Sequence, residues 1–194
     1  MSADALFQVT NALRSRLQTA LTTSTVPGSV FVGPLDDPDA GGAALILFLY
    51  RVVPNGSLRN REHRVASSGT PPTVQVFRNA LPLDLYFLVT VGTNTGGSEE
   101  TLLRALGFVM QELQADPELT SAALNHETVQ VSLEPLTTEE ASRIWTLFPT
   151  ANYRTSIAYL ATPVWIDPPS APPEAAPVTD DQLLAGQRAA EVMS

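Results

Sequence analysis

The sequence predicts an α/β (α+β) fold: a single domain with a mixed, largely antiparallel sheet flanked by helices, followed by a proline-rich tail. Segments with helical and strand-like apolar periodicity follow one another in the order helix, strands, helix, strand, helix, strand. Neighbouring strand-like segments are joined by short turns, which favours antiparallel pairs. The chain of 194 residues is 44% hydrophobic and 16% charged, a composition typical of a globular domain with a buried core.

The first predicted element is a helix over residues 2–23. Its apolar residues mostly recur every three or four positions, as on a helix with one buried face. Ser2 or Asp4 is suited to cap its first turn. The apolar residues are Leu6, Phe7, Val9, Leu13, Leu17 and Leu21.

Two strands are predicted next, over residues 29–32 and 43–53. The second is apolar on both faces, which is typical of a strand inside a sheet. A turn-rich loop, residues 33–42, separates them and carries three acids. These acids are Asp36, Asp37 and Asp39.

Residues 74–77 and 83–91 are predicted to form a further pair of strands. In the second, leucine, phenylalanine and valine alternate with other residues, so that Asp84 faces away from Leu83 and Leu85. We interpret Asp84 as a structural carboxylate that pairs with an arginine of the segment before it, or as a general base. No nucleophile or second acid accompanies it, which favours the structural role.

A second helix is predicted to begin after Ser98, which is suited to cap it, and to end near Asp116-Pro117. A short strand follows over residues 129–133. Thr137 and Glu140 then have the spacing of a capping box, so a third helix should begin there.

The last predicted strand covers residues 158–166, and Pro163 within it indicates a sheet edge or a bulge. We place the end of the domain, residues 1–167, after this strand. The extension, residues 168–194, begins with five prolines in its first ten positions, which predicts a stiff linker. Residues 180–193 have the composition of one short acidic helix.

The segment after the strand 43–53 holds the densest positive charge in the chain. Residues 51–64 contain four arginines and one glutamate, in a chain of net charge −9. Pro54, Asn55 and Gly56 predict a tight turn that presents the arginines from a defined loop. We interpret this loop as a contact for an acidic surface, with an ordinary solvated loop as the alternative.

The composition excludes several classes of function. The chain has no cysteine and no lysine, so thiolate chemistry, cysteine-bound metals, Schiff bases and lysine-dependent phosphate loops are ruled out. His63 and His126 lie in polar segments without metal-ligand spacing and are predicted to lie on the surface. We therefore expect no cofactor, no bound metal and no catalytic residue. The acidic net charge argues against nucleic-acid binding.

Localisation signals are also missing from the sequence. Its longest apolar run, residues 43–50, is far shorter than the roughly 20 residues of a membrane-spanning helix. The first residues do not have the pattern of a secretory signal. We expect cytoplasmic synthesis and no direct membrane insertion.

Four segments together resemble one known family, the tail-terminator or cap proteins of phage-tail-like extracellular contractile injection systems. The resemblance covers roughly residues 4–167, and its most specific parts are the Pro-Asn-x-x-Leu-Arg-Asn element and the last of the four segments. The segments are Leu49-Tyr50-Arg51 with Pro54-Asn55 and Leu58-Arg59-Asn60; Leu81 to Leu85; Leu103 to Gly107 with Asp116-Pro117; and Leu133 to Leu136 running through Trp145 to Tyr159.

The resemblance implies a structural protein rather than an enzyme. It implies a homohexameric ring that ends the inner tube and anchors the last sheath layer, and so fixes tail length, in a particle that is released or membrane-anchored. The partners would be the chain itself, the tube protein and the sheath protein. On this basis the interface candidates are Arg51, Asn55, Arg59, Asn60, Arg61 and Asp84. The alternative is a monomeric adaptor that docks an acidic partner through the arginine loop.

Overall fold

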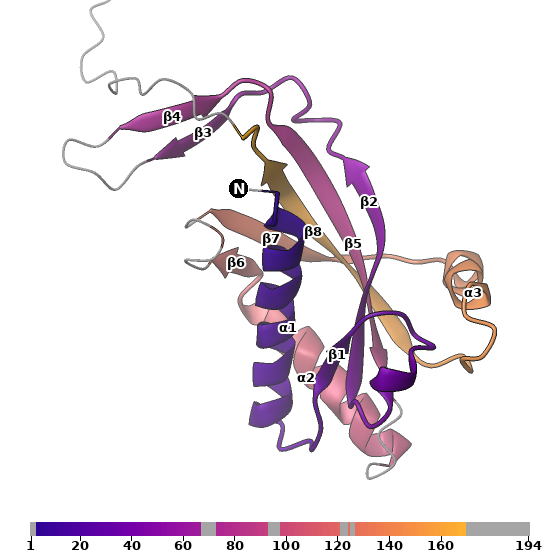
Figure 1. The fold of residues 1–194 in the computed structure, drawn as a ribbon. Coiled ribbons are helices and arrows are strands. Elements are labelled where there is room, and N and C mark those ends of the chain that lie inside the picture. Colours follow the sequence, from indigo (N-terminus) through magenta and orange to yellow (C-terminus); the bar gives the residue numbers. More distant parts are fainter. Residues whose placement is uncertain (1–2, 67–72, 93–97, 121–123, 125–126, 170–194) are drawn as a thin grey trace, which may run out of the picture.

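The computed structural model describes residues 3–66, 73–92, 98–120, 124 and 127–169. Its main body is one six-stranded sheet with the strand order β1-β2-β5-β8-β7-β6 (Figure 1). Strand β1 is parallel to β2, and the other neighbours are antiparallel. The bounds are β1 Val30–Val32, β2 Leu45–Pro54, β5 Leu81–Val91, β6 Glu118–Thr120, β7 Thr128–Glu134 and β8 Ser156–Ile166. The predicted mixed, largely antiparallel α/β fold is confirmed.

Two long helices cover one face of this sheet (Figure 1). They are α1, Ala5–Thr23, and α2, Glu99–Ala115. Helix α1 buries its three-and-four stripe, including Leu13 and Leu17, against the inward-facing residues of β2, β5 and β8. Ser98 caps α2 as predicted, by accepting a hydrogen bond from the Thr101 amide. Asp4 is the residue before α1, but its side chain makes no capping bond there.

The opposite face of the sheet carries a smaller core. Helix α3, Thr138–Thr146, and the short 3-10 helix η1, Pro38–Ala40, border this core. Thr137 and Glu140 form the predicted capping box of α3. The two cores cover both faces of the sheet, so strands β2 and β5 carry apolar residues on each face. The residues of this core include Leu35, Ile46, Leu88, Trp145, Phe148 and Ala158.

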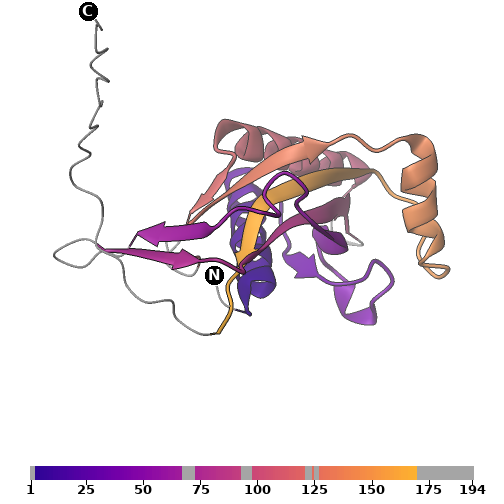
Figure 2. The same cartoon turned by 90° about the horizontal axis from the view of Figure 1, so that it is seen from above.

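Two other strands form a separate hairpin. They are β3, His63–Ala66, and β4, Val74–Phe77, and they pair only with each other. The hairpin lies on the opposite side of the molecule from α3 (Figure 2). The predicted pairing of residues 74–77 with 83–91 is therefore wrong, since β5 pairs with β2 and β8 instead. Strand β3 begins within residues 51–64, the segment predicted as the arginine loop.

Strand β8 is an interior strand, which corrects the predicted possibility of an edge at Pro163. The alternative prediction, a bulge, is confirmed. The β5 register moves from Leu83 opposite Val164 to Leu85 opposite Ala161, so Asp84 faces two residues, Thr162 and Pro163. Proline is tolerated because the bulge disrupts the ladder there.

The proline-rich extension lies outside the described residues, apart from Pro168 and Pro169. Within the described part, none of the helices has both the length and the apolar character of a membrane span.

Gly92 provides a test of the close packing at the end of β5. Its amide donates to the Ala44 carbonyl at 2.8 Å, and an added Cβ would lie 2.0 Å from the Ala43 carbonyl oxygen. We expect Gly92→Ala to lower the free energy of unfolding by about 3 kcal/mol, because the backbone must move. Urea denaturation measures this.

Gly107 on α2 is the matched control, because nothing lies within 4 Å of its added Cβ. Gly107→Ala should raise the free energy of unfolding by about 0.5–1 kcal/mol through helix propensity. An unchanged urea midpoint for Gly92→Ala would contradict the close approach of the two backbone segments at this point.

Candidate functional site

The arginine loop, residues 55–62, joins β2 to β3, and Asn55 forms its base. The Asn55 Oδ1 accepts the amides of Ser57 and Leu58, each at 3.0 Å. This bonding of an asparagine side chain to amides further along the chain is an Asx turn. It confirms the tight turn that Pro54, Asn55 and Gly56 predicted. The Asn55 backbone amide donates to Pro82 O at 2.9 Å, which ties the loop to the start of β5.

Asp84 lies beneath this turn and is half-buried. Its Oδ1 accepts from Asn55 Nδ2 at 2.8 Å and from the Thr162 hydroxyl on the bulge of β8. The predicted arginine partner of Asp84 is therefore wrong. The β8 bulge brings a threonine hydroxyl to the carboxylate, and the Asx turn brings an amide. Asp84 is a structural anchor that joins the loop, β5 and β8.

The arginines of residues 51–64 are exposed. Arg51, on β2, has its guanidinium carbon 5.0 Å from the centre of the Tyr86 ring, a cation–π contact. Arg59, Asn60 and Arg61 are exposed in the turn that follows Asn55. Within the described residues, the side chains of Arg59 and Arg61 have no hydrogen-bond or ion-pair partner. Their charges are available to another molecule.

The acidic loop, residues 33–42, lies at the other end of β2 (Figure 1). Asp37 caps η1 by accepting the amide of Asp39 at 2.9 Å, and Asp36 and Asp39 are exposed. The ten residues of β2 separate the two loops, which at the usual rise of a strand is about 33 Å. The molecule therefore presents unpaired arginines at one end of β2 and carboxylates at the other.

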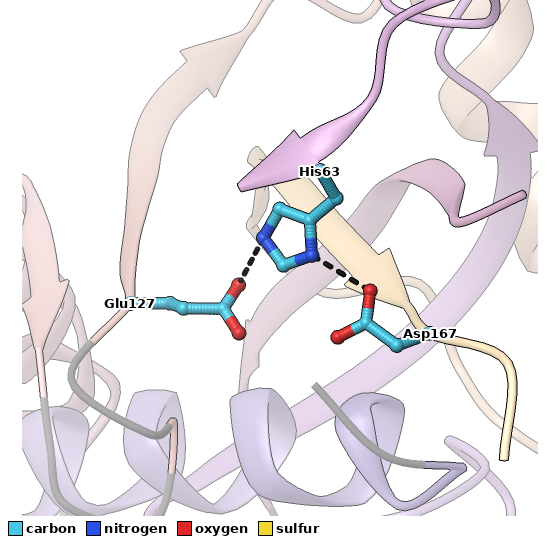
Figure 3. Close-up of side chains that lie close together, drawn as sticks. All are labelled: His63, Glu127 and Asp167. Carbon is cyan, nitrogen blue, oxygen red and sulfur yellow. Dashed lines mark hydrogen bonds and ion pairs between the residues drawn. The ribbon is translucent and has the colours of Figure 1, made fainter. Parts of the chain in front are cut away.

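A second polar cluster lies where the β3–β4 hairpin meets the sheet. His63 Nδ1 lies 2.7 Å from Asp167 Oδ1, and its Nε2 lies 3.1 Å from Glu127 Oε2 (Figure 3). The imidazole stacks on Trp165, with ring centres 4.6 Å apart and planes 9° apart. His63 is only 7% exposed. The prediction that it is a surface histidine is wrong; His126 lies outside the described residues.

The contacts within this cluster shift the pKa values of His63 and Glu127. Burial acts to lower the pKa of His63, but the hydrogen bonds and charges of Glu127 and Asp167 outweigh it and raise the pKa. For Glu127, burial acts to raise the pKa and the hydrogen bond from His63 acts to lower it, and the net direction is down. The imidazole is thus favoured in its protonated form and Glu127 in its ionised form.

The same three side chains bring their donor atoms within 4.8 Å of one another, as the ligands of a cation would. Each ring nitrogen already faces a carboxylate oxygen, and the two nitrogens point in opposite directions (Figure 3). A cation would have to replace one of these contacts and would find few protein ligands. The arrangement fits a proton better than a metal.

Sequence reasoning missed this cluster because its members are widely separated along the chain. His63 and Asp167 are 104 positions apart, and Glu127 lies between them without ligand spacing to either. The one available signal was the aromatic neighbourhood, since Trp165 lies near the end of an apolar strand, two residues before Asp167. Nothing in the sequence pairs that tryptophan with His63.

Comparison with known proteins places this fold in a family. The Pvc16 N-terminal domain family matches residues 8–180. The chain belongs to this family. A search among curated proteins found no match. The family assignment agrees with the resemblance seen in the sequence.

Two solved structures share the fold of this chain. One is the PVC sheath/tube terminator of an extracellular contractile injection system, in its extended state: 16% identity, TM-score 0.59, covering 95% of this chain and 64% of that one. The other is the anti-feeding prophage tube-terminating cap: 18% identity, TM-score 0.59, covering 90% and 59%. This Pvc16 N-terminal domain chain thus spans about three fifths of the length of either.

The Asn55–Asp84 contact predicts a strong effect from one isosteric change. In Asn55→Asp the side chain keeps an oxygen that accepts the amides of the Asx turn. The Nδ2 group that donates to Asp84, however, is replaced by a carboxylate oxygen. We expect the free energy of unfolding at pH 7 to fall by about 2 kcal/mol, because like charges then face each other in a half-buried site. Thermal or urea unfolding measures the loss.

The penalty should shrink at low pH, and the sign follows from the protonation states. Two carboxylates repel each other only while both are ionised, so the destabilisation is largest near neutral pH and shrinks in acid, as carboxylates take up protons. Asn60→Asp, in the exposed part of the same loop, is the control and should change stability little. Equal effects of the two variants at pH 7 would show that Asp84 is not an anchor.

Proposed function

We propose that this protein is a tail terminator: a structural, non-enzymatic cap that ends the inner tube of a contractile injection system and anchors its last sheath layer. The observation that carries the proposal is the extent of the structural likeness. Two terminating caps share the fold over 95% and 90% of this chain, and the Pvc16 N-terminal domain family matches residues 8–180 of it.

The charge distribution supports a ring of identical copies. The arginine loop and the acidic loop lie at opposite ends of β2, so one copy can offer its arginines to the carboxylates of the next. Such a head-to-tail contact is heterologous, and it closes into a ring when the rotation between copies divides a full turn. We propose six copies, with Arg59 and Arg61 directed at Asp36 and Asp39 of the neighbour.

The remaining surfaces would serve the tube and the sheath. A ring seated on the last tube layer stops further growth, and so fixes tail length. The net charge of −9 disfavours nucleic acid as a partner. We propose that the protein is made and assembled in the cytoplasm as part of a phage-tail-like particle, which is then released or anchored at a membrane.

The proposal is tested by the tail-length distribution of particles from cells with and without this gene, measured by electron microscopy. Loss of a terminator should give overlong or irregular tubes, many without attached sheath. Particles of normal, uniform length would contradict the cap and favour the monomeric adaptor. Ring formation on purified tubes separates the same two hypotheses, because an adaptor would bind without forming a ring.

Arg59→Glu tests the arginine loop within that assembly. The guanidinium has no partner in the described part of the monomer, so the folded chain should keep its melting temperature. A reversed charge would face the acidic loop of the next copy, and the particles should show the irregular tails of the deletion. Electron microscopy and thermal unfolding measure the two outcomes.

Arg104→Glu is the matched control, since Arg104 is an exposed arginine on α2, paired with Glu100 at 3.7 Å. It makes the same change in net charge away from both loops, and particles should form normally. Uniform, sheathed tails from the Arg59→Glu variant would remove the arginine loop from the interface, while leaving the cap itself to be judged by the deletion.

A further inference from the structure

The contact between the β3–β4 hairpin and the sheet is built on one histidine. His63 begins β3, Glu127 immediately precedes β7, and Asp167 immediately follows β8. The side chains of these three residues are 8%, 12% and 9% exposed. Three segments that are far apart in the sequence are therefore joined through a single imidazole ring (Figure 3).

The geometry specifies which form of the ring is present. A neutral imidazole has one N–H donor and one bare nitrogen, whereas an imidazolium has two donors. Both ring nitrogens face carboxylate oxygens, which only accept hydrogen bonds when ionised. A neutral ring would direct a lone pair at one of the two carboxylates, so only the protonated ring satisfies both contacts.

Aromatic packing fixes the ring in this position. Trp165 lies against one imidazole face with nearly parallel planes, and Phe77 of β4 stacks at a centre distance of 6.1 Å. Cations are attracted to the faces of aromatic rings. The stacking therefore favours the charged ring and keeps its two nitrogens facing the carboxylates.

We propose that His63 is a proton-dependent clamp, which in its imidazolium form locks the β3–β4 hairpin onto the ends of β7 and β8, and which loosens when the proton is lost. The clamp is a property of the folded chain and does not depend on capping. It is nevertheless relevant to assembly, because the arginine loop lies between β2 and the clamped strand β3.

The pH range of the clamp follows from the groups that face His63. Glu127 and Asp167 face it from the main sheet. Next to the hairpin, Glu62 pairs with Arg64 at 3.2 Å and lies 3.8 Å from Arg78. These three exposed groups carry one net positive charge, which solvent screens from the buried ring. The pKa of His63 is raised above its ordinary value of 6.5.

The sign of the effect on stability follows. A histidine whose pKa is raised by folding contributes stability that is fully present below the unfolded value, and that contribution is lost as the pH rises through the folded value. The clamp is therefore closed below the ordinary histidine pKa of 6.5 and opens as the pH rises through the raised pKa of the folded state.

The first measurement is hydrogen exchange of the β3 and β4 amides in the full chain, corrected for the intrinsic pH dependence of exchange. As the pH rises through the His63 transition, their protection should fall about tenfold, a typical consequence of losing one charge-assisted hydrogen bond. The amides of α1 should keep their protection. Equal protection of the hairpin on both sides of the transition would overturn the proposal.

The second measurement is an NMR titration of the His63 ring in Asp167→Asn. The asparagine oxygen still accepts a hydrogen bond, but the carboxylate charge is gone. The titration midpoint should move to lower pH, and the loss of hairpin protection should move with it. Glu62→Gln is the control, because it removes one negative charge from the residue that precedes His63, whose carboxylate pairs with Arg64 and Arg78 and not with the ring. Its midpoint should stay nearly unchanged.

Two results would contradict the clamp even if Asp167→Asn folds poorly. A wild-type His63 that titrates at or below 6.5 would show that the ring is not held as an imidazolium. A melting temperature that rises with added Zn²⁺ and falls with EDTA in the wild type, but not in His63→Gln, would assign the cluster to a metal instead of a proton.

Discussion

The antiparallel ladder of β2, β5 and β8 is the constraint on which the rest of the structure depends. Its middle strand β5 is buried on both faces: Phe87 and Val89 face α1 and α2, while Leu88 faces the core beside α3. A shift of one residue in register would exchange these two sets. The register therefore fixes both cores, the position of Asp84 beneath the arginine loop, and the separation of the two charged loops along β2.

The elements with local signals could be predicted from the sequence. The three helices followed from apolar spacing and from caps such as Ser98 and Thr137, because both signals lie within a few residues of each other. The hairpin strand β3 and the edge strand β6 could not be predicted. Each is three or four residues long, and β3 owes its position to a partner strand and to a buried ring rather than to its own pattern.

The contrast between local signals and long-range contacts also explains which parts of the candidate site could be predicted. The turn at Asn55 is a local feature, and the Pro-Asn-Gly sequence predicted a turn there. The partners of Asp84 depend on a bulge in β8, and the environment of His63 depends on residues before β7 and after β8. Such long-range contacts bring together residues whose spacing in the sequence carries no information. The arginine loop could be predicted as an exposed, positively charged segment, because its arginines lie close together in the sequence and the prediction needs no long-range contact.

Direct imaging of the particle end tests the central claim, that this chain caps a tube through head-to-tail contacts between copies. A cryo-electron microscopy reconstruction of particles from producing cells should show a closed ring of this chain on the last tube layer, in contact with sheath. Within the ring, the arginine loop of each copy should face the acidic loop of the next. Absence of the chain from the tube end, or a ring in which these loops do not meet, would contradict the account.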